Sequence, residues 1–488
     1  MTAARKPFRA IIVGGGLVSL TAAHILSKAD IDFVILEQHE NLLPEIGSLL
    51  NIWPPTCRVF DQLGLLDAVQ PILNPIKRGV MMSAIDGSIL SEIDPHTTSI
   101  ENHGYGIGAT HRPYFIEALY QNLPDNVKEK IKLKKRVVNV HVWDDGVRVE
   151  CADGTTEEGS IIIGADGVHS RTRQYMQAMA EGKPLPDRSQ PPKSPYLTTF
   201  RMLFINAPIP PGVEANANYE GASERVATQI VTGNSQAWIG IYEALDKPTS
   251  ERRRYTDEDK KKVLEKWGHL YLTPGLKVRD AFALRDGELG LINLEEGHID
   301  KWAWKRIVLV GDAIRKLDPH AGLGYNSGVV DVVVLANKLR RLLRTESSPT
   351  TEALEALFKD YQKERMKVEP NVDNMSRRRA RTTVWLTPMN KIMGKYIGPW
   401  TNLAYWGLHY IYGPLVARIP VLEWLEEKAL PKTYQMPYLY YPTPEGMKLE
   451  DPSKRSVSGR SSLSILTGTV ALAAATAVGL QYYRMLYR

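Results

Sequence analysis

A glycine-rich turn near the start of the chain constrains its fold more than any other feature. An apolar run leads into Gly14-Gly15-Gly16, a helical pattern follows over 17–28, and a second apolar run ends at Glu37. This order predicts a β-turn-α-β unit, the opening of a dinucleotide-binding sheet. Gly14 and Gly16 let the backbone approach a pyrophosphate, whose charge the helix N-terminus then faces. Glu37 can accept hydrogen bonds from both ribose hydroxyls, which favours FAD or NAD over NADP.

Two later segments decide between FAD and NAD. The apolar strand 161–163 runs into a tight turn that contains Asp166, and the segment 307–331 runs from a strand through Asp312 and a proline loop into a helix near Gly324. Asp312 can accept hydrogen bonds from the ribityl hydroxyls of a flavin. The positive end of the helix can face the part of the isoalloxazine ring that gains negative charge on reduction. Because both segments follow the glycine turn in order, they predict bound FAD.

With these motifs, the sequence resembles the group A FAD-dependent monooxygenases of the para-hydroxybenzoate hydroxylase type. The resemblance covers about residues 8–445 and extends to the segments 44–47 and 111–113. It is strongest to the fungal, membrane-bound branch that epoxidises prenyl chains in indole-diterpene and meroterpenoid biosynthesis. Carried over from the family, FAD binding falls on Glu37, Gly47, Arg112 and Asp312.

Two positions depart from the family pattern. Tyr325 stands where the family uses a small residue, and Arg315 stands where a histidine is frequent, which changes the charge at the flavin loop. No metal site is expected, because the histidines lack metal-ligand spacing. The predicted cofactor-binding residues are Gly14, Gly16, Glu37, Gly47, Arg112, Asp166, Asp312, Gly324 and Tyr325.

The segment 196–244 predicts strands of a second layer that forms the substrate wall. An apolar pocket with one phenol to position an alkene suits an oxygenation reaction. Tyr219 lies roughly where the family places an active-site tyrosine, and Tyr219 and Arg201 are the predicted catalytic residues, with Trp238 and Tyr242 as further candidates. The alternative for each is a sheet-packing aromatic or a surface arginine.

The resemblance implies an enzyme that reduces FAD with NAD(P)H and inserts one oxygen atom from O2. The expected product is an epoxide on a farnesyl- or geranylgeranyl-type double bond of a hydrophobic precursor. No second nucleotide-binding pattern is visible, in agreement with a family in which NAD(P)H docks transiently. Three alternatives stay open: a phenol hydroxylase, a prenyl-chain reductase that inserts no oxygen, and a flavin-binding scaffold without turnover.

Charge and cysteine content exclude other classes of protein. The formal net charge is +6 for 488 residues, which gives no reason to expect nucleic acid as a partner. Only Cys57 and Cys151 are present, too few for a disulfide framework or a zinc cluster. The cysteine content therefore favours a reducing compartment.

Two segments of the C-terminal part indicate a membrane. Residues 463–483 carry no charge, and at about 1.5 Å per residue they could cross a hydrocarbon layer of roughly 30 Å. Residues 397–417 are rich in Trp and Tyr but are interrupted by Pro399 and Pro414, which favours interfacial helices over a soluble cap or a span. The apolar run 10–13 is too short for a signal-peptide core. We therefore expect a C-terminal anchor, in the endoplasmic reticulum, with the catalytic part in the cytosol.

Together these features predict an α/β fold: a Rossmann-like FAD-binding domain interleaved with a mixed-sheet substrate domain, a C-terminal helical region and a single C-terminal transmembrane helix. The expected partners are a prenylated small molecule, O2 and membrane lipid, with a terpene cyclase in the same membrane as a candidate. The predicted boundaries are an FAD-binding domain over 1–180 with substrate-domain insertions at about 75–110, a substrate domain over 181–300, the rest of the FAD-binding domain over 301–370, a membrane-interfacial region over 371–447, a linker over 448–462 and the anchor over 463–483.

Overall fold

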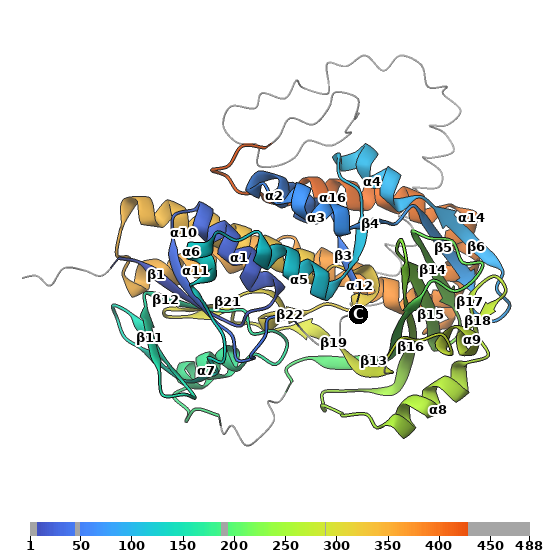
Figure 1. The fold of residues 1–488 in the computed structure, drawn as a ribbon, viewed down its shortest axis with the longest axis horizontal. Helices are drawn as coiled ribbons and strands as arrows, with labels where there is room; N and C mark the ends of the chain where they lie inside the picture. The colour runs from blue at the N-terminus through green and yellow to red at the C-terminus, as the bar shows by residue number, and fades with distance from the viewer. Residues whose placement is uncertain (1–6, 44–48, 187–193, 288, 428–488) are drawn as a thin grey trace, which may run out of the picture.

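The computed structural model describes residues 7–43, 49–186, 194–287 and 289–427 and confirms a mixed α/β fold (Figure 1). The predicted linker and anchor, 448–462 and 463–483, lie outside the described residues, as does Gly47. Within the described ranges, no helix combines the length and the apolar character needed to span a membrane.

The first sheet begins with the predicted β-turn-α-β unit. Its six strands lie in the order β20 (Ala303–Trp304), β21 (Ile307–Leu309), β12 (Ile161–Gly164), β1 (Arg9–Val13), β2 (Asp32–Leu36) and β8 (Ile131–Lys132). From β21 through β12, β1 and β2 to β8 each strand runs parallel to the next, whereas β20 pairs with β21 antiparallel. Their apolar side chains are buried because α1 (Leu17–Lys28), α10 (Gly324–Thr345) and α11 (Thr351–Arg365) pack in a layer alongside. Parallel strands covered in this way are continuous apolar runs.

The second sheet has eight strands that come from three separate stretches of the chain. In order they are β22 (Arg315–Lys316), β19 (Gly290–His298), β13 (Leu197–Pro208), β16 (Gln236–Thr249), β15 (Val226–Thr232), β14 (Ala217–Ala222), β5 (Arg78–Ser83) and β6 (Ile89–Ile93). In Figure 1 this sheet lies at the right and the six-stranded sheet at the left. Strands of the two sheets therefore alternate along the sequence.

Side-chain alternation gives the second sheet two different faces. One face, here called the outer face, carries Leu203, Ile239 and Ile241 and is covered by α8 (Asp257–Trp267) and α9 (Val278–Phe282). The opposite face, here called the inner face, carries Phe200 and Tyr242 and packs against α12 (Glu369–Thr383). In Figure 1, α12 lies where the two sheets meet.

A small sheet joins the two halves. It has the order β3 (Leu49–Ile52), β7 (Gly108–His111) and β4 (Asn74–Pro75). The short elements around it are α2 (Pro54–Leu63), α3 (Leu66–Val69), η1 (Gln70–Ile72), α4 (Pro95–His103), α5 (Arg112–Gln121) and α6 (Asp125–Lys128). The remaining elements before residue 322 are β9 (Val137–Val142), β10 (Val147–Cys151), β11 (Thr156–Gly159), α7 (Arg171–Ala180), β17 (Tyr271–Thr273), β18 (Leu276–Lys277), η2 (Gly311–Ala313) and η3 (Pro319–Ala321).

The aromatic C-terminal stretch folds into short helical pieces. They are α13 (Pro388–Ile392), η4 (Met393–Ile397), α14 (Gly398–Trp400), α15 (Leu403–Trp406), η5 (Gly407–Tyr412) and α16 (Gly413–Ala417). Pro399 and Pro414 stand in the first turns of α14 and α16, and Asn402 adopts a left-handed conformation with φ +50°. One regular spanning helix is therefore absent from 388–417, as the prolines predict; whether these pieces lie at a membrane interface stays a prediction.

Candidate functional site

The glycine turn after β1 has the geometry that a pyrophosphate requires. Gly14 has φ +102°, and a Cβ there would lie 2.7 Å from the carbonyl oxygen of Ala165. A Cβ at Gly16 would meet nothing within 4 Å, so the space before α1 is open. The N-terminus of α1 has no side-chain cap, which leaves its first N–H groups for an anion. These features fit the diphosphate of FAD.

Glu37 follows the last residue of β2, with its carboxylate buried beside the glycine turn. Its Oε2 accepts a hydrogen bond from the Gly15 N–H at 2.5 Å, and its Oε1 accepts one from the His39 N–H at 2.8 Å. Each carboxylate oxygen has a second acceptor position, so both can still accept from ribose hydroxyls. The position of Glu37 therefore fits its predicted role.

Asp166 holds its own loop together. Its carboxylate accepts hydrogen bonds from the Ser170 hydroxyl and from the backbone N–H groups of Arg171 and Thr172, at 2.5, 2.8 and 2.9 Å. These bonds fix the start of α7. The observed geometry thus gives Asp166 a structural task, and its predicted contact with FAD stays a prediction.

Arg173 links the two predicted flavin segments. It is buried, and its guanidinium donates hydrogen bonds to the carbonyl oxygens of Val168 at 2.8 Å and Ala313 at 2.9 Å. The loop after β12 is thereby held against the loop after β21. The sequence showed Arg173 only as part of the first segment. Its contact with the second segment could not be predicted, because Ala313 lies 140 residues further along the chain.

Asp312 and Gly324 lie next to each other at the end of the first sheet. A Cβ at Gly324, where α10 begins, would lie 4.0 Å from Oδ1 of Asp312. The Asp312 carboxylate is partly exposed and forms an ion pair with Lys316 at 2.5 Å. A carboxylate beside an open helix start is the arrangement expected for ribityl hydroxyls and an adjacent flavin ring.

Asn326 is a residue that the sequence reasoning missed. Its Oδ1 accepts hydrogen bonds from the Trp53 N–H at 2.9 Å and the Thr56 hydroxyl at 2.7 Å, and its Nδ2 donates to the carbonyl oxygens of Asn51 and Gly322, both at 2.9 Å. One amide therefore fixes the first turn of α10 to the junction of β3 and α2. The sequence pattern that could have indicated this linking role is an asparagine shortly after a glycine-rich loop.

Tyr325 is buried, whereas Arg112 lies at the surface. The Tyr325 hydroxyl is 2.8 Å from the Thr21 hydroxyl, and its ring meets Phe115 edge-on at 5.7 Å. Burial raises the pKa of Tyr325 above its ordinary value. The Tyr325 side chain thus packs among α1, α5 and α10, and its predicted contact with the cofactor stays a prediction. Arg112 is exposed at the first residue of α5.

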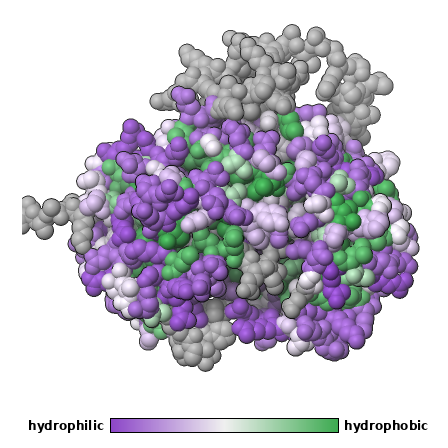
Figure 2. All heavy atoms as spheres, in the orientation of Figure 1, coloured by the Kyte–Doolittle hydropathy of each residue, from purple (hydrophilic) through white to green (hydrophobic). Residues whose placement is uncertain are grey.

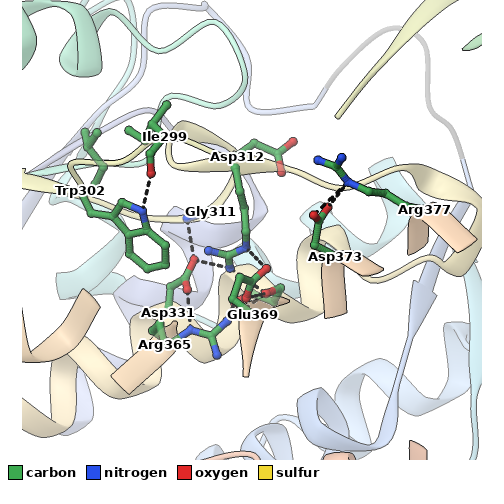
Figure 3. Close-up of polar contacts among 12 residues, drawn as sticks. Ile299, Trp302, Gly311, Asp312, Asp331, Arg365, Glu369, Asp373 and Arg377 are labelled. Atoms are coloured by element: carbon green, nitrogen blue, oxygen red, sulfur yellow. Dashed lines mark hydrogen bonds and ion pairs between the residues drawn. The ribbon is translucent and has the colours of Figure 1, made fainter. Parts of the chain in front are cut away.

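Arg315 belongs to a buried charge cluster beneath the cofactor loop, defined here as Arg315, Asp331, Arg365 and Glu369. Arg315 pairs with Asp331 at 2.7 Å and Glu369 at 2.5 Å, and Arg365 pairs with both carboxylates at 2.8 Å. Figure 3 shows Asp331, Arg365 and Glu369 turned toward one another, with Gly311 bonded to Asp331.

The charge cluster has equal numbers of positive and negative groups. Burial alone would lower the pKa of Arg315, but the carboxylates of Asp331 and Glu369 raise it above its ordinary value. The Gly311 N–H donates to Asp331 Oδ2 at 2.9 Å, so the cluster also holds the turn that precedes Asp312. The extra charge expected of Arg315 is therefore neutralised locally.

The two predicted catalytic residues lie on the outer face, away from the cofactor loop. Arg201 pairs with Glu243 at 2.6 Å. The Tyr219 hydroxyl accepts a hydrogen bond from Arg78 at 3.1 Å, and its ring packs in the cluster covered by α8 and α9. The catalytic role of both residues stays a prediction. Their place on the outer face follows from strand alternation, since a shift of one residue moves a side chain to the opposite face.

The inner face instead carries a chain of polar groups. The Tyr242 hydroxyl donates to Gln229 Oε1 at 2.7 Å, and Gln229 Nε2 donates to Asn218 Oδ1 at 3.1 Å. Arg379 of α12 pairs with Glu220 at 2.6 Å. Burial raises the pKa of Tyr242. Burial would also raise the pKa of Glu220, but Arg379 holds it below its ordinary value.

His320 joins the inner face to the cofactor loop. It comes from η3, between Asp312 and α10, and its ring lies over Tyr242 with centroids 3.9 Å apart. Its Nδ1 is 2.6 Å from Asp318 Oδ1. We define the inner-face cluster as Asn218, Glu220, Gln229, Tyr242, Asp318, His320 and Arg379. Of this group, the sequence reasoning named only Tyr242 as a candidate for the substrate wall.

Comparisons with known proteins agree with this geometry. The FAD binding domain family matches residues 8–375. The FAD-dependent monooxygenase srdH of Neurospora crassa is 33% identical over 408 residues, which are 81% of this chain and 91% of the relative. The FAD-dependent monooxygenase ausM of Penicillium brasilianum is 29% identical over 472 residues, which are 95% of this chain and 94% of the relative.

The fold also matches solved structures. Klebsiella pneumoniae HpxO complexed with FAD and uric acid has a TM-score of 0.63 at 20% identity, over 82% of this chain and 92% of that chain. At this level of identity the likeness concerns the fold alone. The family match and the curated relatives carry the assignment: the chain belongs to the FAD binding domain family and is an FAD-dependent monooxygenase.

Proposed function

We propose that this monooxygenase epoxidises a prenyl double bond of a hydrophobic precursor that it meets at a membrane surface. FAD, reduced by NAD(P)H, supplies the chemistry that activates O2. The observation that carries the proposal is an exposed apolar surface joined directly to the helix that covers the inner face. A lipophilic substrate collects in membranes, so an enzyme that faces the membrane would lie where its substrate is found.

The exposed surface belongs to residues 388–412, here called the aromatic segment. Monomeric proteins rarely expose large contiguous apolar patches, and Trp and Tyr favour the membrane interface. On the face drawn in Figure 2, hydrophobic side chains gather in patches among hydrophilic ones. The exposed large apolar residues of the aromatic segment are Met389, Ile392, Tyr396, Ile397, Trp400, Leu403, Tyr405, Trp406, Tyr410 and Ile411, and Trp400 is 88% exposed.

Helix α12 connects this surface to the inner face. Its Ala380 and the following Val384 pack against Phe200 and Tyr242, and its Arg379 pairs with Glu220. The aromatic segment begins a few residues after α12 ends. A molecule that enters through the aromatic segment would therefore be next to the apolar part of the inner face.

The predicted anchor 463–483 and a location in the endoplasmic reticulum membrane are part of the same proposal. The segment is uncharged and long enough to cross a bilayer. An anchor would hold the aromatic segment near lipid, where prenylated precursors collect. A terpene cyclase in the same membrane is the proposed consumer of the epoxide.

The direct test uses membranes that contain the full chain, with NADPH, O2 and a farnesylated phenol. We expect a product heavier by one oxygen atom that acid converts to a diol on the prenyl chain. Oxygen on the aromatic ring would instead identify a phenol hydroxylase. A product heavier by two hydrogen atoms would identify a prenyl-chain reductase, and NADPH oxidation without an altered acceptor would count against both forms of oxygenation.

The role of the aromatic segment is tested separately with Trp400→Ala. We expect the KM for a farnesylated phenol held in lipid vesicles to rise severalfold, while the KM for the same compound in detergent micelles stays unchanged. Trp143→Ala is the matched control, since Trp143 is 41% exposed beside β9 and outside the aromatic segment. Equal changes for the two variants would contradict the proposed membrane contact.

A further inference from the structure

The pair Asp318 and His320 contains two buried polar atoms whose partners the described residues do not supply. Asp318 is 1% exposed and His320 is 7% exposed. Asp318 Oδ1 lies 2.6 Å from His320 Nδ1 and 3.0 Å from the His320 backbone N. Within the part of the chain that the structure describes, Asp318 Oδ2 and His320 Nε2 have no hydrogen-bond partner. A buried polar atom without a protein partner needs a water, an ion or a ligand to satisfy it.

The carboxylate of Asp318 selects the tautomer of the imidazole. A carboxylate accepts hydrogen bonds, so Nδ1 of a neutral His320 carries the proton and donates it to Oδ1. His320 Nε2 then has a lone pair and no proton. This nitrogen is an acceptor and therefore suits a hydrogen-bond donor.

The position of His320 places this acceptor at the junction of cofactor and substrate sides. Its ring lies over Tyr242 and meets Phe200 edge-on at 6.2 Å, both on the inner face. Its backbone belongs to η3, in the loop that leads from Asp312 to α10. The Ser376 hydroxyl of α12 donates to the Asp318 carbonyl oxygen at 2.9 Å, which fixes this loop to α12.

Apart from Asp318 Oδ2 and His320 Nε2, the polar groups of the inner-face cluster are already engaged. The Tyr242 hydroxyl donates to Gln229, and Glu220 pairs with Arg379. His320 Nε2 is the neutral acceptor of this cluster that is left for a ligand, among the residues described. Its acidic neighbours are Asp318 and Glu220, so a negatively charged ligand would meet adjacent carboxylates.

We propose that His320 Nε2 accepts a hydrogen bond from a neutral hydroxyl or ring N–H of the substrate, and that Asp318 is the positioning residue that holds the proton of the neutral imidazole on Nδ1 and so leaves Nε2 as the acceptor. The proposal rests on the proposed function and narrows its substrate class to prenylated acceptors that carry such a donor. An O-alkylated acceptor lacks the donor and loses this contact. The prenyl chain would lie against the apolar part of the inner face.

The experiment measures binding and not turnover. Oxidised holoenzyme is titrated with a farnesylated phenol and with its methyl ether, and the change in flavin absorbance gives each dissociation constant. We expect the wild type to bind the phenol about tenfold more tightly than the ether, the factor that one buried hydrogen bond supplies. In His320→Phe the two constants should be equal.

Two further variants separate a hydrogen bond from a packing effect. His320→Gln puts an amide oxygen near the position of Nε2 and should restore part of the preference. Asp318→Asn lets an amide N–H donate to Nδ1, which moves the imidazole proton to Nε2, and should also reduce the preference. If His320→Phe does not retain FAD, the loss of the preference for the phenol is measured in Asp318→Asn instead.

The control is His24→Gln, which changes a buried histidine in α1 whose ring nitrogen is 2.9 Å from the Leu119 carbonyl oxygen. It should keep the tenfold preference. A preference that survives in both His320→Phe and Asp318→Asn would overturn the proposal, as would equal binding of phenol and ether by the wild type. If neither compound binds to the wild type, the proposed function fails as well, which distinguishes the two failures.

Discussion

The charge cluster beneath the cofactor loop and the inner-face cluster are both buried and polar, yet they are built differently. The first pairs two arginines with two carboxylates, and every one of these side chains is at most 4% exposed. The second contains one ion pair, a chain of neutral hydrogen bonds and an imidazole nitrogen without a partner among the described residues. A balanced ionic cluster fixes a turn, whereas a cluster with a free acceptor can bind a ligand.

This difference indicates that the charge cluster serves FAD retention and the inner-face cluster serves substrate binding. Replacements in the charge cluster should alter folding and FAD retention, because Asp331 holds the Gly311 turn. Replacements in the inner-face cluster should alter substrate binding and leave FAD in place. Variants of the two clusters test whether FAD retention and substrate binding depend on separate groups of residues.

The largest effect is expected for Asp331→Asn. The change leaves Arg315 and Arg365 buried with one carboxylate between them, and removal of one partner from a buried ion pair costs about 3–5 kcal/mol. We expect a corresponding loss in the free energy of unfolding, measured with urea, and a lower FAD content after purification. Asp360→Asn is the control, because Asp360 also pairs with a basic residue but is 63% exposed. Its loss should be at most about 1 kcal/mol.

The next effect concerns the glycine turn. Gly14→Ala puts a Cβ 2.7 Å from a backbone oxygen at φ +102° and should destabilise the apoprotein by about 1–3 kcal/mol. Gly16→Ala meets no atom within 4 Å, so the apoprotein should keep its stability while FAD binds about tenfold more weakly. Thermal unfolding with and without FAD measures both. If Gly16→Ala leaves FAD affinity unchanged, the open space before α1 is not the diphosphate site.

The FAD side of the molecule was largely predictable because its signals are local. The glycine turn, Glu37 and the start of α10 each follow from a few adjacent residues whose backbone geometry their side chains restrict. Helix α1 was predicted with its exact bounds, Leu17–Lys28. The charge cluster was missed, since Arg315 and Glu369 meet only after α12 folds back on the loop.

The substrate side was predicted less well for a physical reason. Tyr219 and Tyr242 both lie in strands and both are aromatic, but alternation directs the first to the outer face and the second to the inner face. The register that decides this depends on a neighbouring strand distant in the sequence. Asp318 and His320 gave no pattern of their own, because their significance comes from packing against that inner face.

Variants of the two tyrosines test directly which face of the second sheet lies near the substrate. Tyr242→Phe removes a hydroxyl that donates to Gln229 and should lower kcat/KM for a farnesylated phenol about fivefold to tenfold, with FAD content unchanged. Tyr219→Phe removes a hydroxyl of the outer face and should change kcat/KM by less than about twofold. The reverse order would restore Tyr219 as the residue near the substrate.

The smallest effect is expected for the pH dependence of Glu220→Gln. Arg379 holds the folded-state pKa of Glu220 below its ordinary value, so the wild type gains stability from this carboxylate above the unfolded pKa and loses it as pH falls through the lower folded value. Because Arg379 is 41% exposed, we expect a difference of about 1 kcal/mol between wild type and variant at pH 7.

Urea unfolding of both proteins between pH 7 and about pH 3 measures this difference. It should shrink toward zero at the acidic end, while FAD content at pH 7 stays equal in the two proteins. A difference that is constant with pH would mean that Glu220 acts through packing and not through its charge. Loss of FAD in Glu220→Gln would break the separation between the two clusters, because it would show that the contact of α12 with the inner face also holds the cofactor loop.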